Sequence, residues 1–243
     1  FALEEDGRIE NQVRSEYREL NLSNPPKFIW ANSSQQAREI VSSETEVDMI
    51  ICMFNEQDKG IFPFASELKE EGRGIPFVLL IHYSKAVRQR VLESPRPGVD
   101  FVFSWHGNAD LILAIVKLLE DAANADNDVF EVGVKGILLV EDSIRYYSNY
   151  LPELYKIVLT QSREFLKESL NEDQKKYRKR SRPKIFLATC LEEALAYFRK
   201  YGRNLLGVIS DVGMVVHKGD DPKTEKLDAG IDLVKVIREY DPL

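Results

Sequence analysis

Short apolar segments alternate along this chain with longer segments of helical periodicity. Two of the short segments also end in acidic residues: residues 136–140 (GILLV) precede Glu141 and Asp142, and residues 205–210 (LLGVIS) precede Asp211. Apolar runs of about 4–8 residues favour buried strands. Strands that alternate with helical patterns favour βαβ units and a parallel sheet. The sequence therefore predicts an α/β protein.

The acidic residues are expected to gather at one edge of that sheet. The carboxyl ends of parallel strands face the same edge, where open α/β sheets hold their ligands. Three carboxylates within about 4–5 Å of one another repel by several kcal/mol at an effective dielectric near 20. A hard divalent cation, or a raised pKa on one acid, would relieve this repulsion. The simpler alternatives are a helix cap formed by Glu141 and Asp142 and a turn at Asp211.

Composition narrows the class of protein. The 243 residues suffice for one large or two ordinary domains, and 44% apolar with 30% charged residues is typical of a globular protein. A net charge of −7 argues against a dedicated nucleic-acid binder. Cys52 and Cys190 lie in or beside predicted strands, which favours packing roles and a reducing cytoplasm over a disulfide framework. No apolar stretch approaches roughly 18 residues, so we expect no membrane contact.

A degenerate internal repeat predicts two units. Residues 26–33 (PKFIWANS) correspond to residues 183–190 (PKIFLATC), and we expect each segment to form a strand that a helix and a second apolar strand follow. We expect a first unit over residues 1–124, without its first strand, and a second over residues 134–243, which stops after its third helix. Residues 122–134 are expected to form the linker between them.

Further elements follow from periodicity. In the first unit we expect strands over residues 47–53, 75–81 and 100–105, and helices over residues 34–42, 62–71, 83–92 and 110–123. In the second unit, Ser143 should cap a long helix that extends to Leu170, and residues 191–201 and 230–239 should be helical.

The second unit resembles a response-regulator receiver (CheY-like) domain. The residues that carry this resemblance are 137–143 (ILLVEDS), the strand that ends in Asp211, and 229–234 (AGIDLV). The order of the two units is also similar to the N-terminal regulatory region of bacterial phosphoenolpyruvate synthase-like proteins. The resemblance implies two flavodoxin-like doubly wound parallel-sheet units in tandem, each with strand order 2-1-3-4-5 when complete.

The resemblance also implies roles for individual residues. Asp211 would be the phosphoacceptor of a phosphorelay in two-component signal transduction. Asp142 would ligate Mg²⁺ directly and Glu141 through water, and the carbonyl of Gly213 would complete the protein ligands. A histidine kinase, a phosphotransfer protein or a small phosphodonor would supply the phosphoryl group. No independent enzyme activity is expected of this chain.

The sequence departs from the receiver pattern in several places. Asp142 and Asp211 lie farther apart in sequence than in ordinary receivers, and the loop over residues 213–228 is long and polar. In the first unit, Met53 occupies the phosphoacceptor position, Ile81 the position of the switch hydroxyl, and Trp105 that of the lysine. None of these side chains can perform the corresponding role, so we expect the first unit to be an inert pseudo-receiver.

Two other functions remain open at this stage. One is the regulatory region of a phosphoenolpyruvate synthase-like phosphotransferase, with catalytic domains beyond this chain. The other is a scaffold without signalling, with both units retained for homodimerisation. The basic residues among positions 175–184 are expected to form a solvated helix end rather than a nucleic-acid site. His82, His106 and His217 share no metal-ligand spacing, and we expect them to be surface or loop residues.

Overall fold

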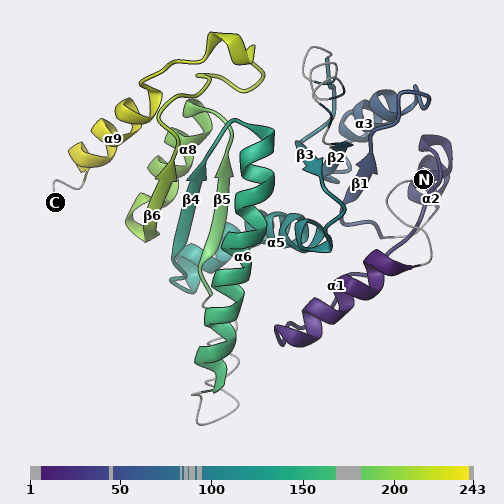
Figure 1. The fold of residues 1–243 in the computed structure, drawn as a ribbon, viewed down its shortest axis with the longest axis horizontal. Helices are drawn as coiled ribbons and strands as arrows, with labels where there is room; N and C mark the ends of the chain where they lie inside the picture. Colours follow the sequence, from purple (N-terminus) through teal and green to yellow (C-terminus); the bar gives the residue numbers. More distant parts are fainter. Residues whose placement is uncertain are drawn as a thin grey trace. The chain divides into compact units, whose positions relative to one another are not determined.

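The computed structural model describes residues 7–43, 46–82, 95–167 and 182–240, with the single residues 84, 87 and 91. The chain divides into two compact units, Phe1–Leu111 and Ile112–Leu243. Each unit combines helices with one three-stranded parallel sheet (Figure 1). The predicted α/β class with parallel sheets is therefore confirmed. The division falls within helix α5 (Ala109–Asp126), which begins in the first unit and continues into the second.

The first unit contains the sheet β1-β2-β3, whose three strands agree with the predicted ones. The central strand, β2, has a neighbouring strand on each side. All of its residues except the last are apolar and buried, as is typical of a central parallel strand. Helix α3 (Ile61–Glu70) buries one face, led by Phe64, Ala65 and Leu68. The strands are β1 (Ile50–Met53), β2 (Phe77–His82) and β3 (Phe101–Trp105).

Two features near the N-terminus differ from the sequence prediction. Helix α1 (Arg8–Glu19) was not predicted, although Ile9, Val13 and Tyr17 recur at helical spacing and are buried. The strand predicted over residues 26–33 does not form, because no strand of the described part pairs with this segment, and Trp30 is exposed. Without a neighbouring strand, the backbone N–H and C=O groups of an extended segment cannot form the hydrogen bonds of a sheet.

Helix α2 (Ser34–Ser42) confirms the next prediction, and Ser33 caps it by accepting a hydrogen bond from the Gln36 backbone N–H (3.2 Å). The helix predicted over residues 83–92 falls largely outside the described residues.

The second unit contains the sheet β5-β4-β6, with β4 in the centre. The carboxyl ends of β4 and β6 therefore lie side by side. Both strands agree with the prediction and are followed by the acidic residues of interest. The strands are β4 (Gly136–Val140), β5 (Lys184–Ala188) and β6 (Leu205–Ser210).

Helices cover both faces of the second sheet (Figure 1). Helices α8 (Leu191–Tyr201) and α9 (Ala229–Tyr240) contact each other and share one apolar cluster with β4 and β5. The long helix α6 (Ile144–Lys167) follows β4 and contains Pro152 in its interior. Its buried side chains include Tyr147, Leu151, Tyr155, Val158 and Leu159, which lie outside that cluster.

The predicted linker over residues 122–134 is instead largely helical. Helix α5 extends through Asp126, and a π-helix, η1 (Asn127–Glu131), follows it directly. Ala125 and Val129 join the core of the second unit, so burial stabilises this segment as a helix. Within the described residues, no helix is both long and apolar enough to span a bilayer.

Candidate functional site

Strand register brings the predicted acidic residues to adjacent positions. Val140 of β4 pairs with Ser210 of β6, and the Asp211 backbone N–H donates to the Val140 carbonyl (3.0 Å). On the other side, the Glu141 N–H donates to the Ala188 carbonyl of β5 (3.0 Å). The sheet therefore continues just past its last assigned residues, and Glu141 and Asp211 leave it on neighbouring strands.

Glu141 is the buried member of this group. It is 5% exposed, and its Oε1 atom accepts a hydrogen bond from the Ser143 backbone N–H (3.1 Å). Burial raises the pKa of Glu141 to about 7. The hydrogen bond from Ser143 lowers this pKa, whereas repulsion from the other acids raises it further. These acids are Asp211, Asp142 and Glu225. A carboxyl group that responds to three other acids lies in an acidic cluster.

Asp142 joins this cluster to the loop that follows β6. Its Oδ2 atom accepts a hydrogen bond from the Val215 backbone N–H (3.0 Å), far along the chain. Burial raises the pKa of Asp142, and the charge of Asp211 raises it further, while the Val215 hydrogen bond opposes both. This hydrogen bond ties the start of the loop to the end of β4.

Asp211 is the exposed member of the cluster. Its Oδ1 atom accepts a hydrogen bond from the Val212 backbone N–H (2.6 Å), and within the described residues its other carboxylate oxygen accepts none. Gly230, at the start of α9, lies against the backbone here: its N–H donates to the Val212 carbonyl (2.8 Å). A Cβ at Gly230 would meet the Asp211 carbonyl oxygen at 2.3 Å, so only glycine permits this approach.

A fourth acidic residue, Glu225, was not predicted as part of the site. A Cβ built on the buried Gly213 would lie 2.1 Å from Glu225 Oε1, so Glu225 covers the glycine predicted to supply a carbonyl ligand. An antiparallel bridge between Met214 and Lys226 folds the loop back and brings Glu225 to this position. The only signal in the sequence was the acidic, polar character of this loop.

The donor chemistry of the cluster fits a hard divalent cation, because carboxylate oxygens are the ligands that Mg²⁺ prefers. However, the described residues contain no group of three or more His, Cys, Asp or Glu side chains arranged to hold a metal ion. One oxygen of each predicted carboxylate ligand already accepts a hydrogen bond from a backbone N–H, that of Ser143, Val215 or Val212. Ligation would require the remaining oxygens of Glu141, Asp142 and Asp211 to turn toward a common point.

Among the described residues of the first unit, no comparable cluster lies at the end of β1. Met53 ends that strand, Ile81 is buried in β2, and Trp105 ends β3 and is also buried. One acid that follows β1, Asp58, accepts hydrogen bonds from the hydroxyl (2.7 Å) and N–H (2.8 Å) of Ser34 at the start of α2. Burial opposes ionisation of Asp58, but the Ser34 and Gly60 hydrogen bonds lower its pKa overall. This carboxylate fixes a helix end.

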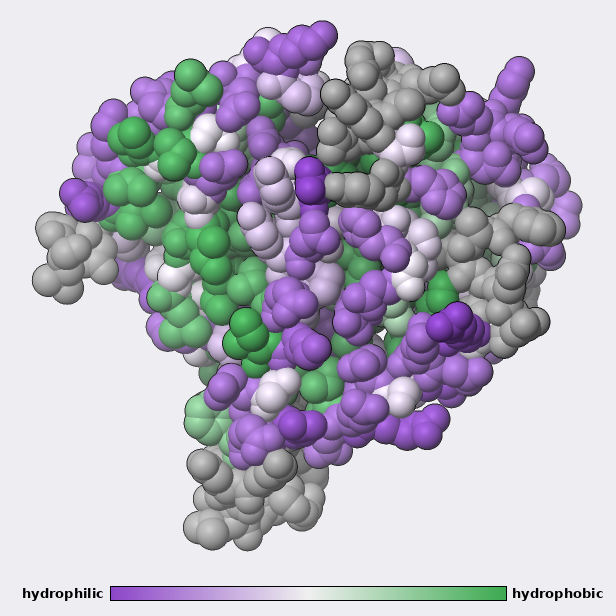
Figure 2. Space-filling view, viewed as in Figure 1, coloured by the Kyte–Doolittle hydropathy of each residue, from purple (hydrophilic) through white to green (hydrophobic). Residues whose placement is uncertain are grey.

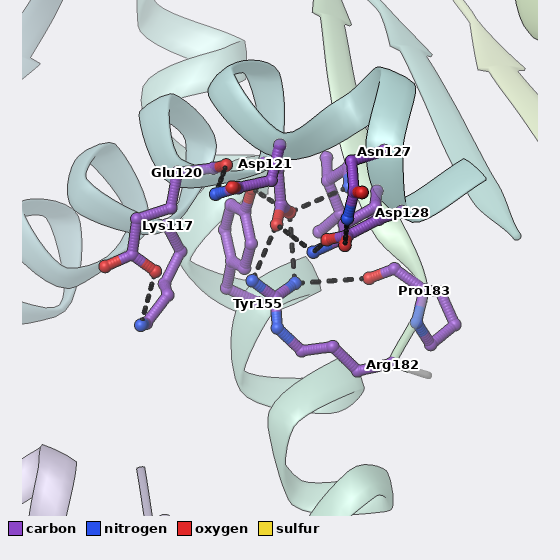
Figure 3. Close-up of polar contacts among 11 residues, drawn as sticks. Lys117, Glu120, Asp121, Asn127, Asp128, Tyr155, Arg182 and Pro183 are labelled. Carbon is purple, nitrogen blue, oxygen red and sulfur yellow. Dashed lines mark hydrogen bonds and ion pairs between the residues drawn. The ribbon is translucent and has the colours of Figure 1, made fainter. Parts of the chain in front are cut away.

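A second polar cluster, built around Asp121 of α5, is structural (Figure 3). The fully buried Asp121 accepts hydrogen bonds from Tyr155 of α6 (2.9 Å) and from two nitrogens of Arg182 (2.6 and 3.0 Å). The Ile185 backbone N–H of β5 also donates to it (3.1 Å), and Lys184 lies 3.5 Å away. All of these donors point toward the Asp121 carboxylate. The carboxylate is therefore fully paired within the protein and is not free to bind a ligand.

This cluster corrects the prediction for the basic residues among positions 175–184. Residues 175–181 lie outside the described part of the chain. Lys184 is buried between Asp121 and Asp128, and the side chain of Arg182 is only 10% exposed beside Asp121. These two residues are therefore internal ion-pair partners and not part of a solvated helix end.

The remaining candidate residues have simple surroundings. His82, His106 and His217 are exposed, as predicted. Cys190 caps the start of α8, where its sulfur accepts a hydrogen bond from the Glu193 backbone N–H (3.5 Å). Burial, with a contribution from Asp58, raises the pKa of Cys52 to about 12.

The chain was compared with protein-family models, with curated proteins and with solved structures, and none of them matches it.

Proposed function

We propose that the second unit receives a signal by Mg²⁺-dependent phosphorylation of Asp211, as in response-regulator receiver domains, and that the first unit is inert. The observation that carries this proposal is the position of Asp211. It leaves β6 beside Glu141 and Asp142 of the adjacent central strand, and its carboxylate is exposed. A nucleophilic carboxylate accessible to a donor, next to acids able to hold a cation, is the arrangement that this chemistry needs.

The strand orders support a flavodoxin-like origin for both units. The order β5-β4-β6 matches strands 2-1-3 of the order 2-1-3-4-5, and β1-β2-β3 matches strands 3-4-5. In open sheets of this type, ligands bind at the carboxyl ends of the strands near the switch point, which here is the end of β4. The candidate acids lie at this position.

In the proposed reaction, an oxygen of the Asp211 carboxylate attacks the phosphorus atom of the donor. The new P–O bond forms as the bond between phosphorus and the leaving group breaks, and the leaving group departs with that electron pair. Glu141, Asp142 and the Gly213 carbonyl would hold Mg²⁺, which when bound neutralises charge on the phosphoryl oxygens. The product is an acyl phosphate of about −1.5 to −2 charge, which would bias the adjoining loop or an interface.

The phosphoryl donor is proposed to be a cytoplasmic histidine kinase, a phosphotransfer protein or a small phosphodonor. The exposure of Asp211 supports access by such donors. The regulatory region of a phosphoenolpyruvate synthase-like phosphotransferase is a broader form of the same proposal, which a continuing reading frame with catalytic segments would support.

A scaffold without signalling is the second candidate. It is favoured by the finding that the described acids do not form a three-ligand metal group. On this alternative, the acids at the ends of β4 and β6 would only fix the loop, as the hydrogen bond from Val215 to Asp142 does.

Intact-mass measurement after incubation with acetyl phosphate and Mg²⁺ separates these candidates. The phosphorylation proposal predicts a single phosphoryl adduct that hydroxylamine removes, that EDTA prevents, and that Asp211→Asn abolishes. The matched control is Asp228→Asn, another exposed aspartate, which should retain the adduct. An adduct equal in wild type and Asp211→Asn, or none in either, would leave the scaffold as the remaining candidate.

A further inference from the structure

The loop over residues 213–228, between β6 and α9, folds back on itself at the carboxyl ends of the strands (Figure 1). Its first arm belongs to the core of the second unit. Met214 is fully buried in the apolar cluster, and the Val215 carbonyl accepts a hydrogen bond from the Leu191 backbone N–H at the start of α8 (3.0 Å). These contacts fix the first arm in place.

The returning arm of the loop is held by contacts at the surface. Lys226 exchanges two backbone hydrogen bonds with Met214 (3.2 and 2.9 Å), and its side chain forms an ion pair with Asp232 of α9. Glu225 and Lys226 are exposed, and Figure 2 shows mainly hydrophilic residues over the outer part of this loop, at the top of the view. A segment with few buried contacts opens at a lower cost than the core does.

The returning arm places the Glu225 carboxylate against Gly213. The Oε1 atom lies where a side chain at position 213 would begin, only 2.1 Å from an ideal Cβ there. Glu225 therefore covers the residue whose carbonyl is a proposed Mg²⁺ ligand. Among the described residues, no cation pairs with Glu225. Its charge instead acts on the site, since it is one of the charges that raise the pKa of Glu141.

We propose that Glu225 is an autoinhibitory residue, whose carboxylate restrains phosphorylation of Asp211 until the returning arm of the loop moves away. This inference rests on the proposed function of Asp211. A phosphoryl group carries about −1.5 to −2 charge near neutral pH, and Glu225 adds a negative charge to the acids that it must approach. Like charges repel, so the closed loop disfavours the reaction. Opening the returning arm would remove this charge while Met214 keeps the first arm in place.

The rate of phosphorylation by acetyl phosphate at saturating Mg²⁺ tests this inference. Glu225→Gln keeps the shape of the side chain and removes its charge, so the initial rate should rise at least about threefold. Glu239→Gln, at an exposed glutamate of α9, is the matched control and should leave the rate unchanged. The difference between Glu225→Gln and wild type should shrink as ionic strength rises from about 0.1 to about 1 M, because salt screens exposed charges. A purely structural role would not show this dependence.

Gly213→Ala displaces the same carboxylate by a different route. The new Cβ would meet the end of a flexible side chain, which can turn away, and the backbone of Gly213 is not in the left-handed region. The variant also keeps the carbonyl at this position. Gly213→Ala should therefore raise the rate in the wild-type background and add nothing in the Glu225→Gln background, because both changes remove one contact.

The outcomes separate this inference from the proposed function. A faster adduct in Glu225→Gln that Asp211→Asn abolishes supports the inference, even where wild type forms none. A rate in Glu225→Gln equal to that of wild type would overturn it and leave the proposed function standing. A lower rate that needs more Mg²⁺ would also overturn it, and would identify Glu225 as a cation ligand. If neither protein forms an adduct, the proposed function fails and this inference fails with it.

Discussion

The backbone N–H of Asp211 donates a hydrogen bond to the carbonyl of Val140 at 3.0 Å. This contact fixes the register of β6 against the central strand at the point where both strands end. It places Asp211 beside Glu141, the residue that follows Val140, although the two acids are far apart in sequence. The proposed site depends on this one register, because a slip of one residue would turn Asp211 to the other face of the sheet.

The first prediction concerns pH and the stability of the second unit. The pKa of Glu141 is about 7 in the folded protein, above its ordinary value of 4.5, so the folded state binds the proton more tightly. Stability should therefore fall as pH rises from about 4.5 to 7. Glu141→Gln should be neutral at pH 5 and stabilising at pH 8 by on the order of 1 kcal/mol.

Urea unfolding in EDTA at both pH values measures this difference. Glu131→Gln, at an exposed glutamate outside the acidic cluster, is the control for the substitution itself. Equal effects of Glu141→Gln at pH 5 and pH 8 would contradict the assigned environment.

The second prediction concerns the Asp121 cluster. Asp121→Ala would leave Arg182 and the Tyr155 hydroxyl without their buried acceptor, and Lys184 would keep only Asp128. Removing one partner of a buried ion pair costs about 3–5 kcal/mol, so thermal unfolding should move to a markedly lower temperature. Asp126→Ala on the same helix breaks the exposed pair with Lys200 and the hydrogen bond from the Tyr201 hydroxyl, and it should cost only about 1–2 kcal/mol. Similar losses in the two variants would show that the cluster is not structural.

The third prediction concerns Gly230. Gly230→Ala would place a Cβ 2.3 Å from the Asp211 carbonyl oxygen, and the obstructing atoms are backbone that cannot rotate away. We expect a loss of about 1–3 kcal/mol and a slower phosphorylation of Asp211, because α9 must shift. Gly207→Ala is the control, since a Cβ there has no neighbour within 4 Å. Denaturant curves at one low protein concentration compare the two, and equal stability would contradict this packing.

The fourth prediction concerns Cys52. Its pKa of about 12 leaves little thiolate at pH 8–9, so alkylation by iodoacetamide should be on the order of a hundredfold slower than in the urea-unfolded chain. A Cys190→Ser variant, which keeps a capping side chain at that position, isolates the signal. A rate close to that of the unfolded chain would show a reactive, accessible thiol.

Much of the second unit was accessible from sequence because its signals are local. The apolar runs before Glu141 and Asp211 are buried strands, and their parallel pairing follows from the helices between them. Glu225 was not predictable in the same way. Its approach to Gly213 depends on the Met214–Lys226 bridge, a contact within an irregular loop that has no periodic signal.

Other errors arose where distant partners decide the outcome. Arg182 and Lys184 lie in a basic run that is typical of a solvated surface, but Asp121, far earlier in the chain, makes them internal. Residues 26–33 have the composition of a strand, and composition cannot supply the neighbouring strand that they lack. The missed helix α1 did carry a local signal in the spacing of Ile9, Val13 and Tyr17.

Cation binding tests most directly whether Glu141, Asp142 and Asp211 form one site. Electron paramagnetic resonance of Mn²⁺, which shares the octahedral oxygen ligation of Mg²⁺, reports free ion during a titration. The account predicts one site per chain, competed by Mg²⁺, lost in Asp142→Asn and in Asp211→Asn, and kept in Asp228→Asn. Absence of binding at millimolar Mn²⁺, or binding that Asp142→Asn leaves unchanged, would contradict it.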